Sequence, residues 1–336
     1  MLVTSCSGGG DSSPADDDDS DAVTDADGDS DSATDTDGDG SGDVLPEPGP
    51  SRSLHFVANA TKEFDYARQS SVPATFGIAE FTLDFWVKLD SAYPVGPTVA
   101  GNDQLLNWTA SDNGPYVSAD WWWRGNFLLD GHNHNALEQG TFSVQIYGGG
   151  RLRWLFGDGS LVGPGNFFGI EQWPASGTPT LLDGVWHQAS LVRRYTGMTS
   201  ATLELWIDGA LVASETTNVR TNMQTAYWQS WTGYPAGQQG WVWGAHKQAA
   251  IGVLDQYEDF KGRLAEVRFW SKARSTTELA TDWKKKTVGN EAGLVGWYRF
   301  DEDTGSLACD ELNGTSCWSI SRGAPNVWAS DGPPLE

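Results

Sequence analysis

The stretch ATLELWIDGALVAS, residues 201–214, carries the pattern that decides the fold of this 336-residue chain. Leu203, Leu205 and Ile207 alternate with other residues, so they share one face of an extended strand. Asp208-Gly209 follows at once, and this dipeptide favours a two-residue type I′ turn. Apolar residues then return with the same alternation. The stretch therefore predicts a β-hairpin with one buried face.

The same period of two recurs on both sides of this hairpin. In FTLDFWVKL, residues 81–89, apolar side chains occupy every second position, beginning with Phe81. GRLAEVRFW (262–270) and GLVGWYRF (293–300) are further predicted strands. SKARSTTELATDWKKK (271–286) is the one predicted helix, because it contains a Ser and a Glu in capping-box spacing. Many short strands with one short helix predict an all-β fold, an antiparallel β-sandwich.

The acidic charge is concentrated at one end of the chain. Residues 1–51 contain 14 Asp and one Glu but no Lys, Arg or aromatic residue, whereas the whole chain carries a net charge of −24. Residues 7–50 are predicted to be a disordered Asp/Gly/Ser-rich linker, because they cannot bury enough apolar surface to offset the entropy of ordering. So acidic a chain is not expected to bind nucleic acid. No apolar run reaches the roughly 18 residues that a membrane helix needs.

A lone cysteine precedes the acidic segment. Val3-Thr4-Ser5-Cys6 looks like the lipobox at which bacterial lipoprotein signal peptides are cut and the cysteine is acylated. Residues 1–6 are interpreted as the remnant of a signal peptide, although only Leu2 and Val3 precede the motif where an apolar core is needed. The other interpretation is a chance match of four residues. The first interpretation predicts an exported protein, at the cell surface or the outer membrane or secreted, that contacts the membrane only through a lipid on Cys6.

Four motifs in one order resemble a known family. FTLDFWVKL, DGVWHQASLVRR, LELWIDGALVAS and FKGRLAEVRFWSKARSTTEL are similar to the laminin G-like jelly roll of the concanavalin A-like lectin/glucanase superfamily. The resemblance covers most of residues 52–320, and the domain is predicted to span 52–336. It implies two curved antiparallel sheets, with a ligand bound at the rim of the sandwich or on a concave face.

Two insertions, near 107–140 and 218–243, interrupt the resemblance. Both are rich in Gly, Asn, Gln and aromatic residues, a composition typical of loops. An aromatic ring can stack on the apolar face of a sugar while neighbouring amides reach its hydroxyls. Candidate carbohydrate contacts are Trp121, Trp122, Trp123, Trp228 and Trp231. The competing interpretation is that these tryptophans pack the insertions onto the sandwich.

Catalytic and metal motifs are weaker. Glucanases of the superfamily carry two carboxylates on one strand in E-x-D-x-x-E spacing, and this string is absent here, so no enzyme is expected. Glu204 and Asp208 share strand parity, but Asp208 belongs to the predicted turn. The resemblance implies one Ca²⁺, for which Asn59 and Asp65 are candidate ligands. Ala265 stands where the family usually has an aspartate in this region.

The two remaining cysteines are eight residues apart. Asn313-Gly314 lies between Cys309 and Cys317 and supplies turn chemistry that can bring them together. In an oxidising compartment such thiols normally pair, so a disulfide is predicted. Two free thiols in a reducing compartment are the alternative.

Together these features predict a surface-tethered, non-catalytic module that binds a carbohydrate or a glycoprotein. A protein-binding adhesion or structural module is the alternative, since the fold alone does not decide the ligand. A glycoside hydrolase or polysaccharide lyase with an unrecognised site is the third possibility.

Overall fold

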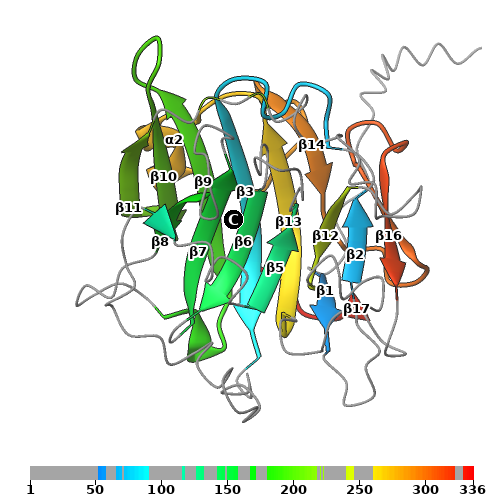
Figure 1. Cartoon of the computed structure of the whole chain (residues 1–336). Coiled ribbons are helices and arrows are strands. Elements are labelled where there is room, and N and C mark those ends of the chain that lie inside the picture. The colour runs from blue at the N-terminus through cyan, green and yellow to red at the C-terminus, as the bar shows by residue number, and fades with distance from the viewer. Residues whose placement is uncertain are drawn as a thin grey trace, which may run out of the picture. The chain divides into compact units, whose positions relative to one another are not determined.

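The computed structural model describes residues 52–57, 66–69, 72–90, 116–117, 126–131, 142–147, 150–157, 167–171, 180–217, 220, 222, 240–245, 260–321 and 328–336. All of them belong to one compact unit, Pro48–Glu336. Their strands form two antiparallel sheets that face each other across a shared apolar core (Figure 1). Within these residues, no helix is long and apolar enough to cross a lipid bilayer.

The first sheet contains eight strands among the described residues. They are β1 (Ser53–Phe56), β3 (Phe81–Leu89), β9 (His187–Tyr195), β10 (Ala201–Ile207), β11 (Ala210–Thr217), β13 (Gly262–Trp270), β14 (Leu294–Tyr298) and β17 (Trp328–Ala329). Their order is β11-β10-β9-β3-β13-β1-β17. Strand β14 pairs with the second half of β13, beyond the half that pairs with β1.

The second sheet contains nine strands in the described part of the chain. They are β2 (Tyr66–Gln69), β4 (Tyr116–Val117), β5 (Asn126–Asp130), β6 (Phe142–Tyr147), β7 (Arg151–Gly157), β8 (Phe167–Glu171), β12 (Trp241–Trp243), β15 (Leu307–Cys309) and β16 (Cys317–Ser321). Their order is β15-β16-β2-β12-β5-β6-β7-β8-β4. Strands β5 to β8 form a meander, whereas β2, β12 and β16 come from distant parts of the sequence.

The predicted alternation of β3 is confirmed by its packing. Phe81 and Phe85 point into the space between the sheets, where their rings lie 5.9 Å from Trp154 and 6.2 Å from Trp243. Both phenylalanines are fully buried. Side chains from the two sheets therefore interdigitate in one core, as expected of a sandwich.

The predicted hairpin is also confirmed. Strands β10 and β11 pair antiparallel, and the two turn residues Asp208 and Gly209 have φ angles of 49° and 76°. A side chain at Gly209 would collide with the ring of Trp283, since its Cβ would lie 2.6 Å from Cδ1. Gly209 is thus required both by the turn and by this close contact.

The predicted helix begins where the capping box placed it but is shorter than the stretch that suggested it. Helix α2 covers Thr276–Thr281, and the Ser275 hydroxyl accepts a hydrogen bond from the Glu278 amide while the Glu278 carboxylate accepts one from the Ser275 amide. Trp283 lies beyond the helix end, with its ring 5.8 Å from that of Trp86. For the described residues, the predicted all-β sandwich of jelly-roll type with a single short α-helix is confirmed.

Candidate functional site

Most of the sequence-predicted site residues lie outside the described residues. These are Cys6, the candidate calcium ligands Asn59 and Asp65, and the tryptophans Trp121, Trp122, Trp123, Trp228 and Trp231. Cys309 and Cys317 are described, and they form the predicted disulfide between the paired strands β15 and β16. The Asn313-Gly314 turn closes this hairpin, and the Gly314 amide donates to the Asp310 carbonyl at 2.7 Å.

The two insertions are not loops throughout. The segment 107–140 contains strands β4 and β5, and 218–243 ends in β12. Trp241 and Trp243 of β12 are fully buried in the core, stacked on Phe142 and Trp318 respectively. The structural reason is that β12 completes the sheet between β2 and β5, so its aromatic residues face the apolar interior.

Strands β5 and β12 each follow a tryptophan-rich segment of the sequence. They are direct neighbours, with Val242 opposite Asp130. The segment that contains Trp121, Trp122 and Trp123 runs into the first residue of β5, and the segment that contains Trp228 and Trp231 runs toward the first residue of β12. Because the pair is antiparallel, these two entry points lie at opposite ends of it.

Four polar side chains occupy the outer face of the same sheet, away from the core. We call them the outer row: Asp130 on β5, Ser143 and Gln145 on β6, and Arg153 on β7. The core-facing residues of these strands, such as Leu129 and Val144, point the other way. Asp130 lies opposite Ser143, and Gln145 opposite Arg153.

The outer row is buried, although it does not belong to the core. Asp130, Ser143 and Gln145 have 0% exposure and Arg153 has 1%. Leu155 and Val242 are buried on the same outer face and lie outside the core cluster. Both faces of the nine-stranded sheet are therefore shielded from solvent in its middle. Buried polar groups of this kind require hydrogen-bonding partners.

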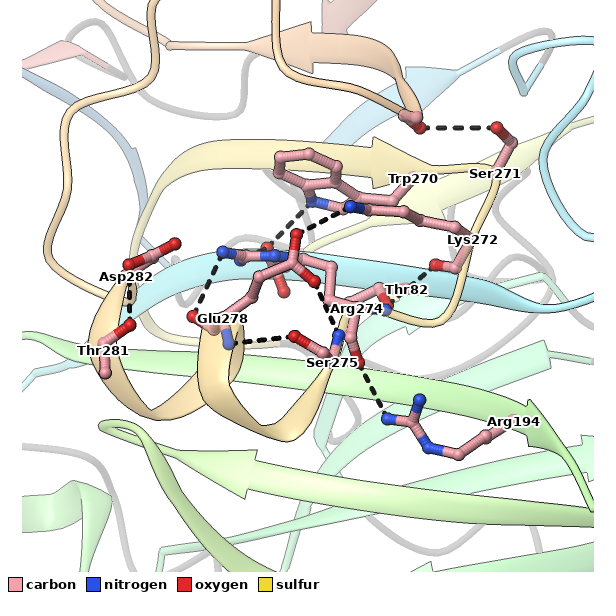
Figure 2. A network of polar contacts seen from close by, with 12 residues as sticks. Thr82, Arg194, Trp270, Ser271, Lys272, Arg274, Ser275, Glu278, Thr281 and Asp282 are labelled. Atoms are coloured by element: carbon pink, nitrogen blue, oxygen red, sulfur yellow. Dashed lines mark hydrogen bonds and ion pairs between the residues drawn. The ribbon is translucent and has the colours of Figure 1, made fainter.

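The outer face of the eight-stranded sheet is organised differently, by ion pairs beneath helix α2 (Figure 2). Asp84 on β3 is fully buried and binds Arg274 Nη1 at 2.8 Å. The same carboxylate oxygen accepts the indole N–H of Trp270 at 2.9 Å. The Arg274 guanidinium lies over the Trp270 ring, 4.7 Å from its centroid. The segment that leads into α2 is thus fixed to the sheet.

A second carboxylate on this face is equally engaged. Glu204 on β10 accepts two hydrogen bonds from the Arg194 guanidinium, at 2.8 and 3.2 Å, and a third from the indole N–H of Trp206. Arg194 also donates to the carbonyl of Arg274, which links this pair to the first (Figure 2). Hydrogen bonds to Glu204 are the main cause that raises the pKa of Arg194. Glu204 is therefore committed to structure rather than to acid–base chemistry.

His187 links the hairpin turn to the preceding chain. Its Nδ1 lies 2.7 Å from Asp208 and its Nε2 lies 3.1 Å from Asp183. Burial lowers the pKa of His187, but the hydrogen bonds to both carboxylates outweigh burial, so the pKa is raised from 6.5. Asp208 also accepts the Gln188 amide at 2.9 Å. Together these contacts hold the turn in place, which gives His187 a structural role.

The acidic segment DEDTG (301–305) lies in a loop between β14 and β15. Burial raises the pKa of Glu302 to about 7. Within the described residues, no group of three or more His, Cys, Asp or Glu side chains is arranged to hold a metal ion. Ala265 is buried in β13.

The outer row is not among the sites predicted from the sequence. A signal was present: FSVQIY and RLRWLFG alternate apolar with polar residues at Ser143, Gln145 and Arg153. Alternation alone predicts that such residues face water. Whether such residues are buried depends on long-range packing against the sheet, and the alternation within one strand does not reveal this packing.

No protein-family model matches the sequence. No curated protein matches it. Among solved structures, the chain is similar to a candidate carbohydrate-binding protein of Bacteroides ovatus, at 14% identity and a TM-score of 0.49, with 85% of this chain and 62% of that chain covered. It thus spans less than two thirds of that protein.

Two further structures are similar at lower scores. One is the CBM40 module of a Ruminococcus gnavus sialidase bound to α2,3-sialyllactose, at 12% identity, 70% and 100% coverage and a TM-score of 0.39. The other is the LG4-5 region of the mouse laminin α1 chain, at 11% identity, 67% and 44% coverage and a TM-score of 0.35. With TM-scores below 0.5, what those proteins bind remains a property of those proteins. The chain itself is an antiparallel β-sandwich whose two sheets bury their outer faces in different ways.

Proposed function

We propose that this chain is a non-catalytic, laminin G-like module that binds a carbohydrate or a glycoprotein. A lipid on Cys6 would tether it to the cell surface, and the acidic segment 7–50 would hold the sandwich away from the membrane. The observation that carries the ligand assignment is the nine-stranded sheet, in which β5 and β12 pair directly and each continues from a tryptophan-rich segment.

The outer row supports this assignment by its chemistry. Asp130, Gln145 and Arg153 offer carboxylate, amide and guanidinium groups, which are good at fixing polar neighbours in one orientation. Because they are buried, they would position the ligand-contacting residues rather than touch a ligand themselves. Aromatic side chains from the two segments would supply the stacking surface that a pyranose needs.

The spacing of the two segments favours an extended ligand. Their entry points are Asn126 and Trp241, which stand at opposite ends of the β5–β12 pair. At about 3.4 Å per residue, the five residues of β5 separate these points by about 17 Å. An oligosaccharide is long enough to contact residues near both points, whereas a monosaccharide is not.

A glycan array with the full-length chain tests the proposal, followed by titration with oligomers of increasing length. We expect binding that strengthens from monosaccharide to oligosaccharide. Gln145→Leu should weaken this binding, because it removes the amide from the outer row. Gln188→Leu is the matched control, since Gln188 is equally buried but lies on β9 in the other sheet.

Two outcomes would contradict the ligand assignment. One is that the folded protein binds no glycan on the array. Specific capture of a protein partner would then favour the adhesion module. The other is an equal loss of binding in both glutamine variants, which would make Gln145 a residue of general structural importance only.

The tether has a separate test. With a signal sequence supplied upstream, in a host that acylates lipoproteins, the wild-type protein should partition into the detergent phase and Cys6→Ser should move it to the aqueous phase. A wild-type protein that stays wholly aqueous would refute lipidation and leave the ligand assignment untouched.

A further inference from the structure

Glu302 is placed at an open edge of the nine-stranded sheet. Strand β15 is the last strand of the sheet on this side, so one edge of its backbone has no neighbouring strand among the described residues. Glu302 lies in the loop that precedes β15, and its Oε1 accepts the outward-pointing amide of Cys309 at 3.1 Å. Its side chain thus satisfies a backbone donor that an edge strand would otherwise expose.

The second oxygen of this carboxyl group has no such contact. Glu302 Oε2 is buried and has no hydrogen-bond partner in the described part of the chain. A buried oxygen without a partner is tolerated far better in a neutral carboxylic acid than in a carboxylate. The geometry therefore favours the protonated form of Glu302.

The surrounding charges act in the same direction. Asp301 and Glu311 carry the like charges that act on Glu302, and Asp310 acts in turn on Glu311. The nearby cations are already paired: Arg299 binds Asp301 at 2.5 Å, and Arg52 pairs with Asp303. On β13, Glu266 is buried and bound to the Trp297 indole. An ionised Glu302 would therefore add a negative charge to an acidic neighbourhood that has no unpaired cation among these groups.

We propose that Glu302 is a proton-dependent latch that holds the loop 301–306 against edge strand β15 when its carboxyl group is neutral and releases the loop when it ionises. Release exposes the Cys309 amide and the edge of β15, while the disulfide keeps β15 joined to β16. The edge of the nine-stranded sheet is then closed in mildly acidic conditions and opens toward neutral pH.

The direction of the effect follows from linkage. Burial raises the pKa of Glu302 from 4.5 to about 7. The negative charges of Asp301 and Glu311 act in the same direction, whereas hydrogen bonds from the amides of Glu302 and Cys309 lower the pKa. In the released loop the pKa returns toward 4.5, so the open form gains from ionisation between these two values. The opening equilibrium should therefore rise by up to tenfold per pH unit from about pH 5 to 7 and level off above.

Amide hydrogen exchange of the full-length chain, read by NMR between pH 5 and 8, tests the latch. After correction for intrinsic exchange, the protection of Cys309 should fall steeply up to pH 7 in the wild type. Glu302→Gln mimics the neutral form, so its protection should not change with pH. Glu215→Gln is the control, because Glu215 is exposed on β11 of the other sheet and should leave the wild-type profile unchanged.

A carboxyl ¹³C titration provides a second measurement on the unaltered chain. The Glu302 resonance should titrate near neutral pH, and Glu311→Gln should lower that midpoint by removing a neighbouring negative charge. The latch is refuted if Glu302 titrates with the ordinary acids, or if Cys309 protection follows the same pH profile in Glu302→Gln as in the wild type.

Discussion

The outer faces of the two sheets both contain buried polar side chains, but these side chains are arranged differently. On the eight-stranded sheet, each buried carboxylate binds one arginine and one tryptophan. Asp84 binds Arg274 and Trp270. Glu204 binds Arg194 and Trp206. On the nine-stranded sheet, the buried polar side chains form a row that extends across three neighbouring strands. The first arrangement pairs charges with the segment that leads into α2, whereas the second places amide, carboxylate, hydroxyl and guanidinium groups side by side across the sheet.

This difference distinguishes polar residues that stabilise the fold, such as Asp84 and Glu204, from the outer row, which is part of the candidate binding site. A carboxylate whose two oxygens both accept hydrogen bonds, such as Glu204 with Arg194 and Trp206, has little capacity left for a ligand. A row of amide, carboxylate, hydroxyl and guanidinium groups can order side chains that do contact one.

The largest effect is expected from removing Arg274. Arg274→Ala leaves the carboxylate of Asp84 buried without its cation, which should lower the free energy of unfolding by about 3–5 kcal/mol. Chemical denaturation measures this change. Lys285→Ala is the control, since Lys285 is 68% exposed in its pair with Asp282 and should cost at most about 1 kcal/mol. A loss below 1 kcal/mol for Arg274→Ala would show that the ion pair under α2 is not a structural requirement.

The disulfide should have the next largest effect, at the edge of the other sheet. Replacing both Cys309 and Cys317 by Ser should lower the free energy of unfolding by about 2–3 kcal/mol, because the bridge closes a short loop in the unfolded chain. Thiol labelling of the denatured, unreduced wild type should find neither cysteine reactive. Two labelled thiols in protein from an oxidising compartment would contradict the bridge.

The tryptophans of the two segments should affect binding more than folding. Trp122→Ala or Trp231→Ala should weaken glycan binding by about 1 kcal/mol with little change in melting temperature. Trp243→Ala is the contrasting variant, because this buried ring should cost about 3–5 kcal/mol of stability. If every tryptophan of the two segments behaves like Trp243 and none alters binding, the aromatic platform is wrong.

The smallest effect concerns His187. Its raised pKa means that protonation stabilises the fold, and this contribution is fully present below pH 6.5 and is lost as the pH rises through the folded value. Relative to His187→Gln, the wild type should therefore lose stability from about pH 6.5 upward, by less than about 1 kcal/mol. Urea denaturation at several pH values measures the difference. A difference that does not vary with pH would mean that the charge of His187 contributes nothing.

Local chemistry explains which parts of the fold were predictable. The Asp208-Gly209 turn, the alternation of β3 and the capping box of α2 depend on residues close in sequence, and all three are present. The disulfide was predictable for the same reason, since only a short turn separates its cysteines. The end of α2 was not, because packing of Trp283 on Trp86 replaces a further helical turn.

The candidate site depends on pairing between distant residues. Asp130 and Val242 are neighbours only because β5 and β12 pair across more than a hundred residues of sequence. Trp231 and Trp243 both belong to the insertion near 218–243, and Trp243, which is not among the predicted contacts, lies in the core. Burial is decided by the neighbouring strand, and a single sequence does not identify that neighbour.

The position of β1 has a consequence for the order in which the protein can fold. Leu54 lies opposite both Leu264 and Trp328, and the Ser53 hydroxyl donates to the carbonyl of Asp331 at 2.7 Å. The first strand of the sandwich therefore acquires its last neighbour only after nearly the whole chain has been synthesised. Such long-range pairing slows folding, because the entropy of closing a large loop is lost before the contacts form. A chain that lacks residues 328–336 should consequently keep β1 open on one side, so that the eight-stranded sheet is completed only when β17 is available.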